Sequence, residues 1–268
     1  MTDIVKILAN ELGIKTAQVE ATINLIDEGN TIPFISRYRK EVTGSLNDEI
    51  LRQFDERLKY LRNLEEKKTQ VLSAIEEQGK LTDELKKEIE AAITLVAVDD
   101  LYRPFRPKRR TRAMIAVEKG LEGFANDIFE EKLNSDATEE AKKYLSDKEG
   151  LEVETEADAI AGAMDIIAEK ISDDAGFRNK IREMSFKQGI LMSAAKDETL
   201  ESVYENYYNF AESVSKVAGY KILAINRGED EKILTVKLDP PVEDIIKYLE
   251  RSIIKKHNNL LNLSHRQV

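Results

Sequence analysis

The chain has 268 residues, of which 41% are apolar, enough to form a hydrophobic core in one large or two smaller domains. Charged residues make up 34% and aromatic residues 6%, and tryptophan is absent, a composition that favours long amphipathic helices over a β-sandwich. The sequence has no cysteine, which excludes disulfides, cysteine-ligated zinc and a thiol nucleophile. The net charge of −10 argues against nucleic-acid binding over the whole surface, so any such contact has to be local.

The N-terminal sequence predicts no export. From Met1 it opens directly into an amphipathic pattern and lacks the basic and apolar regions of a secretory signal. The most apolar run, Ala91–Val98, is far shorter than the roughly 20 residues that a membrane-spanning helix needs. Together with the missing cysteines, these features predict a soluble cytoplasmic protein with no membrane partner.

The first predicted elements are two short helices joined at Gly13. Apolar residues repeat at helical spacing on both sides of this glycine, which predicts a tight helical hairpin. The spacing of Ala9, Gly13 and Val19 also fits a helix-turn-helix, in which small residues let two helices cross closely. The second helix, however, carries Glu20 and Asp27 where a helix that contacts DNA needs cations. A plain hairpin is therefore the favoured interpretation of this helix-turn-helix-like unit.

A short helix with a basic end follows. Pro33 suits the first turn of a helix, which we expect to continue to Glu41. Its end carries Arg37, Tyr38 and Arg39, and this mixture of cations and an aromatic ring is also found at nucleic-acid contacts. Pairing of the cations with the helix end is the favoured interpretation, because the C-terminus of a helix attracts positive charge.

One long helix is expected next. Asn47 is a good N-cap residue, and the apolar pattern after it continues to Gln78. At 1.5 Å per residue such a helix is about 45 Å long, so the sequence predicts an elongated scaffold. Thr82 then caps a further helix that is expected to end near the pair Asp99 and Asp100.

The segment from Tyr102 to Arg112, here called the basic loop, combines two aromatic residues with a run of cations. Pro104 and Pro107 prevent regular helix and push the residues before them toward extended backbone. The segment is therefore predicted to be a loop. Thr111 is placed to cap the helix that follows, which we expect over residues 112–119.

Helices continue through most of the remaining chain, with only two strand-like runs. Helices are expected at residues 121–129, 138–146, 155–171, 174–184, 200–217 and 242–256. The runs Ile222–Ile225 and Lys232–Leu238 flank a predicted turn at Asn226–Asp230 and suggest a hairpin, with the 242–256 helix as its partner layer, although the first run fits a helix equally well. The predicted fold is mainly all-α, with at most one short β-hairpin near the C-terminus.

Two interpretations of the basic loop stay open from composition alone. In the first, cations contact phosphates while Tyr102 and Phe105 stack on unpaired bases. In the second, Tyr102 and Phe105 are core anchors, Arg103 pairs with Asp99 or Asp100, and the remaining loop is solvated. The candidate phosphate contacts are Arg106, Lys108, Arg109, Arg110 and Arg112, with Arg37 and Arg39 as secondary candidates.

No catalytic constellation is evident in the sequence. The two histidines, His257 and His265, lie in a polar C-terminal tail, and no glycine-rich phosphate loop, HExxH motif or nucleophile elbow occurs. The pair Asp99 and Asp100 is favoured as a salt-bridging brace over a metal or acid–base site. We therefore predict no enzymatic activity, no cofactor and no metal.

Four blocks of the sequence resemble the signature blocks of the bacterial Tex proteins, the transcription accessory proteins. They are TIPFISRYRKEVTG at 31–44, DLYRPFRPKRRTRA at 100–113, EKGLE at 118–122 and AINRGE at 224–229. The blocks occur in the family's order, and the resemblance covers about residues 1 to 240. It identifies the chain as similar to the N-terminal region of a Tex protein.

The resemblance implies an architecture that this chain carries only in part. Tex proteins are similar to the core of the eukaryotic elongation factor of the suppressor-of-Ty class, with an elongated helical scaffold, an RNase H-like domain, helix-hairpin-helix motifs and a C-terminal OB-fold. They bind nucleic acid, largely through the OB-fold, and have no established catalytic activity. The chain shows neither an RNase H-like nor an OB-fold pattern. We expect the N-terminal part of a longer protein, as a fragment or natural truncation, with a helical domain at 1–195 and a helical and β connecting segment at 196–268.

Two functional hypotheses follow. The first is a non-enzymatic scaffold that contacts RNA or DNA weakly through the basic loop. The alternative is a protein-interaction module whose acidic faces bind the transcription machinery, without nucleic-acid contact of its own. The oligomeric state does not follow from the sequence.

Overall fold

The computed structural model describes residues 4–133 and 135–254, and most of these residues are helical, which confirms the mainly α-helical fold class. The chain divides into two compact units, Met1–Arg106 and Pro107–Val268. The elongated scaffold and the domain division near residue 195 stay predictions. None of the described helices has the length and apolar character that crossing a bilayer requires. His257 and His265 lie outside the described residues.

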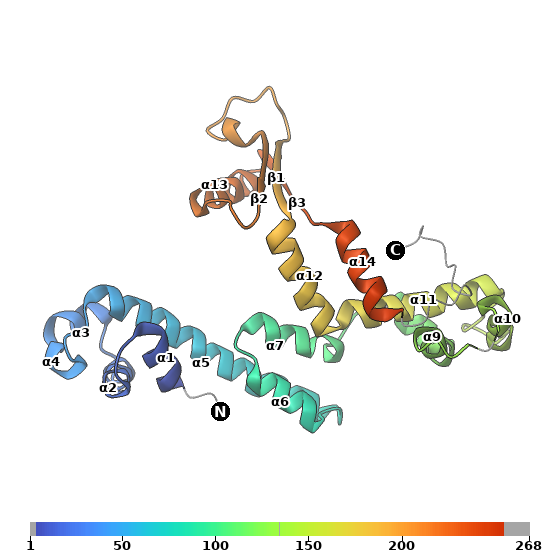
Figure 1. The fold of residues 1–268 in the computed structure, drawn as a ribbon, viewed down its shortest axis with the longest axis horizontal. Helices are drawn as coiled ribbons and strands as arrows, with labels where there is room; N and C mark the ends of the chain where they lie inside the picture. The colour runs from blue at the N-terminus through green and yellow to red at the C-terminus, as the bar shows by residue number, and fades with distance from the viewer. Residues whose placement is uncertain (1–3, 134, 255–268) are drawn as a thin grey trace. The chain divides into compact units, whose positions relative to one another are not determined.

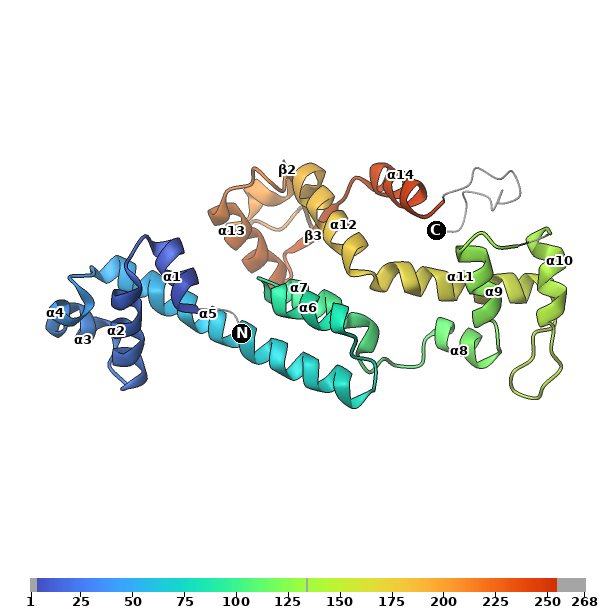
Figure 2. The same cartoon turned by 60° about the horizontal axis from the view of Figure 1, so that its bottom comes forward.

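The first unit begins with four short helices that pack around the start of a long one (Figures 1 and 2). Gly13 turns the chain with a φ of 65°, a left-handed conformation that glycine adopts without strain. The predicted hairpin is present, whereas its helix-turn-helix-like role stays a prediction. The elements are α1 (Ile4–Leu12), α2 (Thr16–Asp27), α3 (Ile32–Tyr38), α4 (Lys40–Thr43) and α5 (Asp48–Glu77).

The long helix α5 confirms the predicted run and supports two core clusters. Its first turn is capped by Asn47, whose side-chain oxygen accepts a hydrogen bond from the Ile50 backbone N–H at 2.8 Å. Toward the N-terminal half of α5, Phe54 and Leu58 are buried against α1 and α2. Toward its end, Val71 and Ile75 are buried with residues of the next two helices. Its buried residues recur at helical spacing from Leu51 to Ile75, so one apolar face supports the helix along most of its length.

The single helix predicted between Thr82 and Asp99 is wrong, because the structure has two helices there. These are α6 (Asp83–Ala91) and α7 (Leu95–Tyr102). Between them Ala92 has extended backbone, and the Thr94 hydroxyl accepts a hydrogen bond from the Ala97 N–H at 3.1 Å. Threonine competes in this way for backbone donors at a helix start, so it begins a new helix here.

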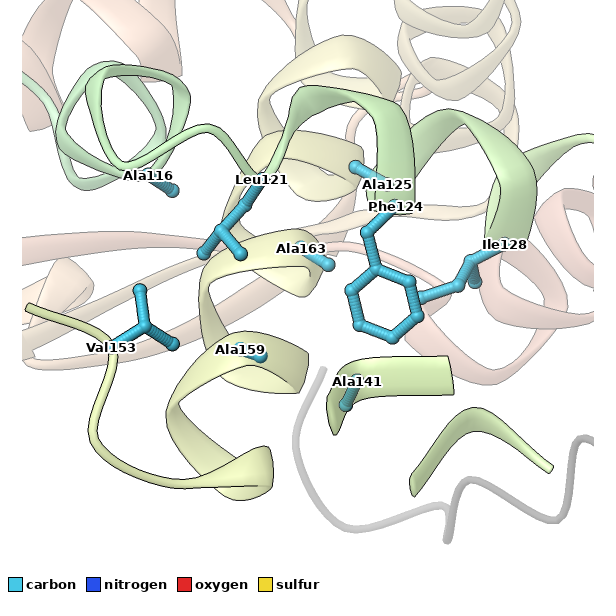
Figure 3. Packing of buried hydrophobic residues seen from close by; sticks show 9 residues of the cluster. All are labelled: Ala116, Leu121, Phe124, Ala125, Ile128, Ala141, Val153, Ala159 and Ala163. Carbon is cyan, nitrogen blue, oxygen red and sulfur yellow. The ribbon is translucent and has the colours of Figure 1, made fainter. Parts of the chain in front are cut away.

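The second unit opens with a helical core whose long element is α11 (Glu156–Asp173). Phe124 and Leu121 pack onto Ala159 and Ala163 of α11 (Figure 3). Gly162 permits this approach, because a Cβ there would lie 2.4 Å from Leu121 Cδ1. The neighbouring helices are α8 (Arg112–Glu118), α9 (Glu122–Phe129), α10 (Ala137–Ala141) and α12 (Ala175–Gln188).

A small antiparallel sheet follows α12. Its strands are β1 (Ile190–Ala195), β2 (Asn209–Ser213) and β3 (Leu234–Asp239), in the order β2-β1-β3. Ser193 in the central strand pairs with Phe210 of β2 and Val236 of β3. The helix α13 (Gly219–Asp230) packs on β3 (Figure 1), and Gly228 is the point of closest approach, since a Cβ there would lie 2.7 Å from Leu234 Cδ1.

The predicted hairpin is therefore wrong in its pairing. Leu234–Asp239 is a strand, as expected, but Ile222–Ile225 and the predicted turn at Asn226–Asp230 both lie within α13. The predicted helix at 200–217 is also wrong, because it contains β2. Short apolar runs fit a buried helix face as well as a strand, and here Ile225 is fully buried on the helix that covers the sheet.

The last described helix, α14 (Val242–Ile253), packs against α12. The Phe177 and Tyr248 rings meet edge to face, with centroids 6.1 Å apart. We expected this helix to be the partner layer of the strands, but α13 takes that role.

Candidate nucleic-acid interface

The two aromatic residues of the basic loop are anchors of the first unit's core. Tyr102 ends α7, and Phe105 closes a short 3-10 turn that begins at Arg103. Both rings pack partly buried against the cluster around Ile75 and Val98. The Gln78 side-chain amide also donates a hydrogen bond to the Phe105 carbonyl oxygen, at 3.0 Å. These rings therefore hold the loop in place and are poorly placed to stack on bases.

Arg106 is paired within the same unit. Its guanidinium donates a hydrogen bond to the Asp99 carboxylate and lies 5.6 Å from the centroid of the Tyr102 ring. Lys67 is a second cation on Asp99, at 3.4 Å. Asp99 is thus a salt-bridging brace, as the sequence suggested, with Arg106 and Lys67 as its cations.

The loop residues of the second unit run along an acidic stripe on α11. The stripe consists of Asp165, Glu169 and Asp173, which follow one another at four-residue spacing and so share one face of the helix. Lys108 donates hydrogen bonds to Asp173 and, at 2.8 Å, to Glu169 Oε1. The positive charge of Lys108 is therefore already paired with two carboxylates.

Thr111 and Arg112 extend this contact along α11. The Thr111 hydroxyl donates a hydrogen bond to Glu169 at 3.2 Å while it caps α8. Arg112 reaches Asp165 at 3.2 Å, although its own side chain stays 85% exposed. Exposed pairs of this kind contribute about 0–1 kcal/mol, so Arg112 can change partners at small cost.

Lys108 is less exposed than Arg106, Arg110 and Arg112. Its side chain is 25% exposed, and burial alone would lower the pKa of the ammonium group, but hydrogen bonds to Asp173 and Glu169 outweigh that effect and raise its pKa overall. Lys108 therefore stays charged and bound. We assign it a structural role in fixing the loop to α11.

Arg109 and Arg110 are exposed, as Arg112 is. Arg110 pairs with Glu118, and both side chains are largely exposed. Arg109 is exposed and forms no ion pair with any residue in the ranges that the structure describes. Around the loop in this unit, the cations Lys108, Arg109, Arg110 and Arg112 are matched in number by Glu118, Asp165, Glu169 and Asp173.

The secondary candidates lie on α3 and just after it. Arg37 is exposed and has no ion pair among the described residues. Arg39 donates a hydrogen bond to the Tyr38 carbonyl oxygen at 3.2 Å, and its guanidinium lies 5.3 Å from the centroid of the Phe34 ring. The predicted pairing of these cations with the helix end is therefore seen for one N–H group of the Arg39 guanidinium. It is not seen for Arg37.

A hollow of about 470 Å³ lies beside Arg112, between α8 and α11. Its lining also includes Lys119 and four acidic residues, Glu152, Glu154, Asp158 and Asp165. Because acidic residues outnumber the two basic ones, the hollow does not favour an anion such as a phosphate.

Comparison with known proteins decides the family. The sequence profile of the Tex-like protein N-terminal domain matches residues 2–76, and that of the Tex central region matches residues 132–267. The chain belongs to the Tex family. The first and last resemblance blocks, at 31–44 and 224–229, lie inside these matched ranges, whereas the basic loop lies between them.

Relatives of the Tex family align over most of the chain. The uncharacterized protein YdcI of Bacillus subtilis is 44% identical over 94% of this chain and 35% of its own length. The transcriptional accessory protein Tex of Neisseria gonorrhoeae is 39% identical over 90% of this chain and 32% of its own. The human S1 RNA-binding domain-containing protein 1 is 29% identical, over 88% and 24%. The chain thus spans about a third or less of the length of these relatives.

Reasoning from the sequence missed the acidic stripe on α11 that pairs with the loop cations. Asp165 and Glu169 were counted only as part of the predicted helix at 155–171, and Asp173 fell just beyond it, although their four-residue spacing was visible. It also gave no weight to Phe34, whose ring contacts both Tyr38 and Arg39. The candidate phosphate contacts stay predictions. The structure shows which of these cations are paired with carboxylates and which are exposed.

Proposed function

We propose that this chain is a non-enzymatic scaffold region of a Tex-family transcription accessory protein and that it contacts nucleic acid weakly through the basic loop. The carrying observation is that Arg109, Arg110 and Arg112 are exposed, with Arg109 unpaired among the described residues. Exposed cations contact phosphates at little cost, because their present pairs contribute about 0–1 kcal/mol each. The names of the relatives, a transcriptional accessory protein and an S1 RNA-binding domain-containing protein, support the process and the ligand class.

The predicted contact is weak and depends strongly on salt. The chain carries a net charge of −10, so phosphates are repelled away from the loop. Each phosphate that is neutralised on a single strand changes the slope of log affinity against log salt by about −0.7. Contacts by two or three arginines therefore give measurable binding only at low ionic strength.

The non-enzymatic part of the proposal is supported by the role of Asp99. Over residues 4–133 and 135–254, no group of three or more His, Cys, Asp or Glu side chains is placed to hold a metal ion. The one acidic pair that the sequence singled out contributes Asp99 to a salt bridge with Arg106. The salt bridge of Asp99 favours a scaffold over an active site at this point.

The alternative is a protein-interaction module without nucleic-acid contact. The matched cations and carboxylates around the basic loop favour it, because they leave little net positive charge there. The acidic connection before α11 presents the exposed side chains of Glu149, Glu152 and Glu154. In this alternative these faces bind cationic surfaces of transcription proteins.

A fluorescence anisotropy titration separates the two functions. Labelled single-stranded RNA and duplex DNA are titrated at low and moderate salt with the chain and with the double variant Arg109→Ala, Arg110→Ala. This variant removes two accessible cations and leaves the Lys108 contacts with α11 intact. The proposal predicts binding at low salt that the double variant weakens several-fold. Absent binding at low salt rules out the nucleic-acid contact, and unchanged binding by the variant rules out the loop as its site.

A further inference from the structure

A second group of basic residues lies in the first unit, on α3 and the start of α4. Figures 1 and 2 show where these two helices lie in that unit. Arg37, Arg39 and Lys40 are exposed and form no ion pair within the described part of the chain. Glu41 is the one carboxylate between residues 34 and 42. This stretch therefore carries a net positive charge, whereas the cations around the basic loop are matched by carboxylates.

Aromatic rings lie among these cations. Phe34 and Tyr38 are four residues apart, so they share a face of α3, and their ring centroids are 5.3 Å apart with planes inclined by 46°. The Tyr38 side chain is 61% exposed and the Phe34 side chain 36%. The aromatic rings of the basic loop are packed against the core, whereas Phe34 and Tyr38 are exposed and accessible to a ligand.

Phe34 organises the surface. It contacts the Tyr38 ring on one side, and the Arg39 guanidinium lies 5.3 Å from its centroid. Arg37 lies three residues after Phe34, which makes the two side chains neighbours on the surface of the helix. The two inclined rings are therefore bordered by cations, while Ile35 is buried and fixes the helix to the core.

We infer that the surface formed by Phe34, Arg37, Tyr38, Arg39 and Lys40 binds single-stranded nucleic acid, with a base stacked on Tyr38 and phosphates on the arginines. The inference rests on the proposed function in that it takes nucleic acid as the ligand. Base–aromatic stacking requires an unpaired base, whereas a duplex offers only its phosphates to an exposed ring on a convex helix. The net positive charge favours this ligand over an apolar protein partner.

The test uses fluorescein-labelled oligouridylate and a labelled DNA duplex with four variants of the whole chain. Tyr38→Ala removes the stacking ring, and Tyr38→Phe restores it. The double variant Arg37→Ala, Arg39→Ala removes two phosphate contacts. Tyr220→Ala is the matched control, because Tyr220 is a similarly exposed tyrosine (69%) on α13.

We expect Tyr38→Ala to weaken oligouridylate binding on the order of tenfold, since stacking contributes about 1–3 kcal/mol per base. Tyr38→Phe and Tyr220→Ala should bind like the wild type. The double arginine variant should reduce the salt slope by about 1.4. Equal binding by Tyr38→Ala and the wild type overturns the inference, as does a preference for the duplex.

The outcomes keep the two proposals apart. If the wild type binds and only Arg109→Ala, Arg110→Ala weakens it, the proposed function stands and this surface is not the site. If only the α3 variants weaken binding, the proposed contact through the basic loop is wrong, and the surface on α3 and α4 is the binding site. If the wild type binds neither ligand at low salt, both fail.

Discussion

Lys108 donates a hydrogen bond to Glu169 at 2.8 Å and thereby fixes the basic loop to a helix 61 residues further along the chain. The same ammonium group also binds Asp173. The cations of the basic loop look alike in the sequence, but Lys108 is held by α11, whereas Arg109, Arg110 and Arg112 are exposed.

Lys108→Ala should destabilise the protein, because it leaves the partly buried carboxylates of Glu169 and Asp173 with one cation fewer. We expect a loss of about 1–2 kcal/mol in the free energy of unfolding, measured by urea denaturation. Arg109→Ala is the matched control and should change stability by less than about 0.5 kcal/mol. Equal effects of the two substitutions would show that Lys108 has no special structural role.

Gly228→Ala should also destabilise the protein, although alanine ordinarily stabilises a helix over glycine by about 1 kcal/mol. A Cβ at this position would lie 2.7 Å from Leu234 Cδ1 and 3.2 Å from Tyr204 Cδ1. Leu234 is fully buried, so the clash forces α13 away from β3 and costs about 1–3 kcal/mol.

The control for this substitution is Gly123→Ala in α9, where the nearest atom to an added Cβ is the Tyr144 hydroxyl at 3.6 Å. It should leave stability unchanged or raise it. Thermal unfolding of both variants gives the comparison, and a higher Tm for Gly228→Ala than for the wild type contradicts the close packing described here.

The ion pair of Asp27 and Arg62 should make stability depend on pH. Arg62 donates two hydrogen bonds to the Asp27 carboxylate, at 2.7 and 2.8 Å, and this holds the pKa of Asp27 below its ordinary value. A lowered folded-state pKa means that the pair stabilises the protein above about pH 4 and that this contribution is lost as pH falls through the folded pKa.

Both side chains of this pair are about half exposed, so solvent screening limits the coupling to about 0.5 kcal/mol. A double-mutant cycle with Asp27→Asn and Arg62→Gln, measured at pH 7 and again near pH 2, gives this coupling. It should be larger at the higher pH than at the lower one. A coupling free energy that is the same at both pH values would mean that it does not depend on the ionisation of Asp27.

The helices of this protein could be predicted where local signals and one apolar face agreed. Asn47 and the long stripe after it predicted α5, and Thr111 predicted the start of α8. The break at Thr94 was missed, because a threonine within an apolar run also fits a continuous helix. The sheet was missed for another reason: β1 pairs with β2 and β3, and such non-local pairing has no signature in the short strand segments themselves.

The candidate site was predictable only in part. The prolines predicted a loop at residues 102–112, and its cations were evident. Their partners were not, because the α11 carboxylates lie 53 to 65 residues away from the cations with which they pair, and four-residue spacing of acidic residues is common on solvated helices. The availability of each cation is a property of these tertiary contacts, so only the structure distinguishes Lys108 from Arg109.

The most direct test of nucleic-acid contact is photocrosslinking of the chain to 4-thiouridine-substituted single-stranded RNA at low salt, followed by mass spectrometry of the crosslinked peptides. We expect crosslinks in peptides that contain Tyr38 or Arg109, and we expect added salt to reduce them. Absence of crosslinks, or crosslinks confined to the acidic connection around Glu149 and Glu154, would contradict nucleic-acid binding by these surfaces.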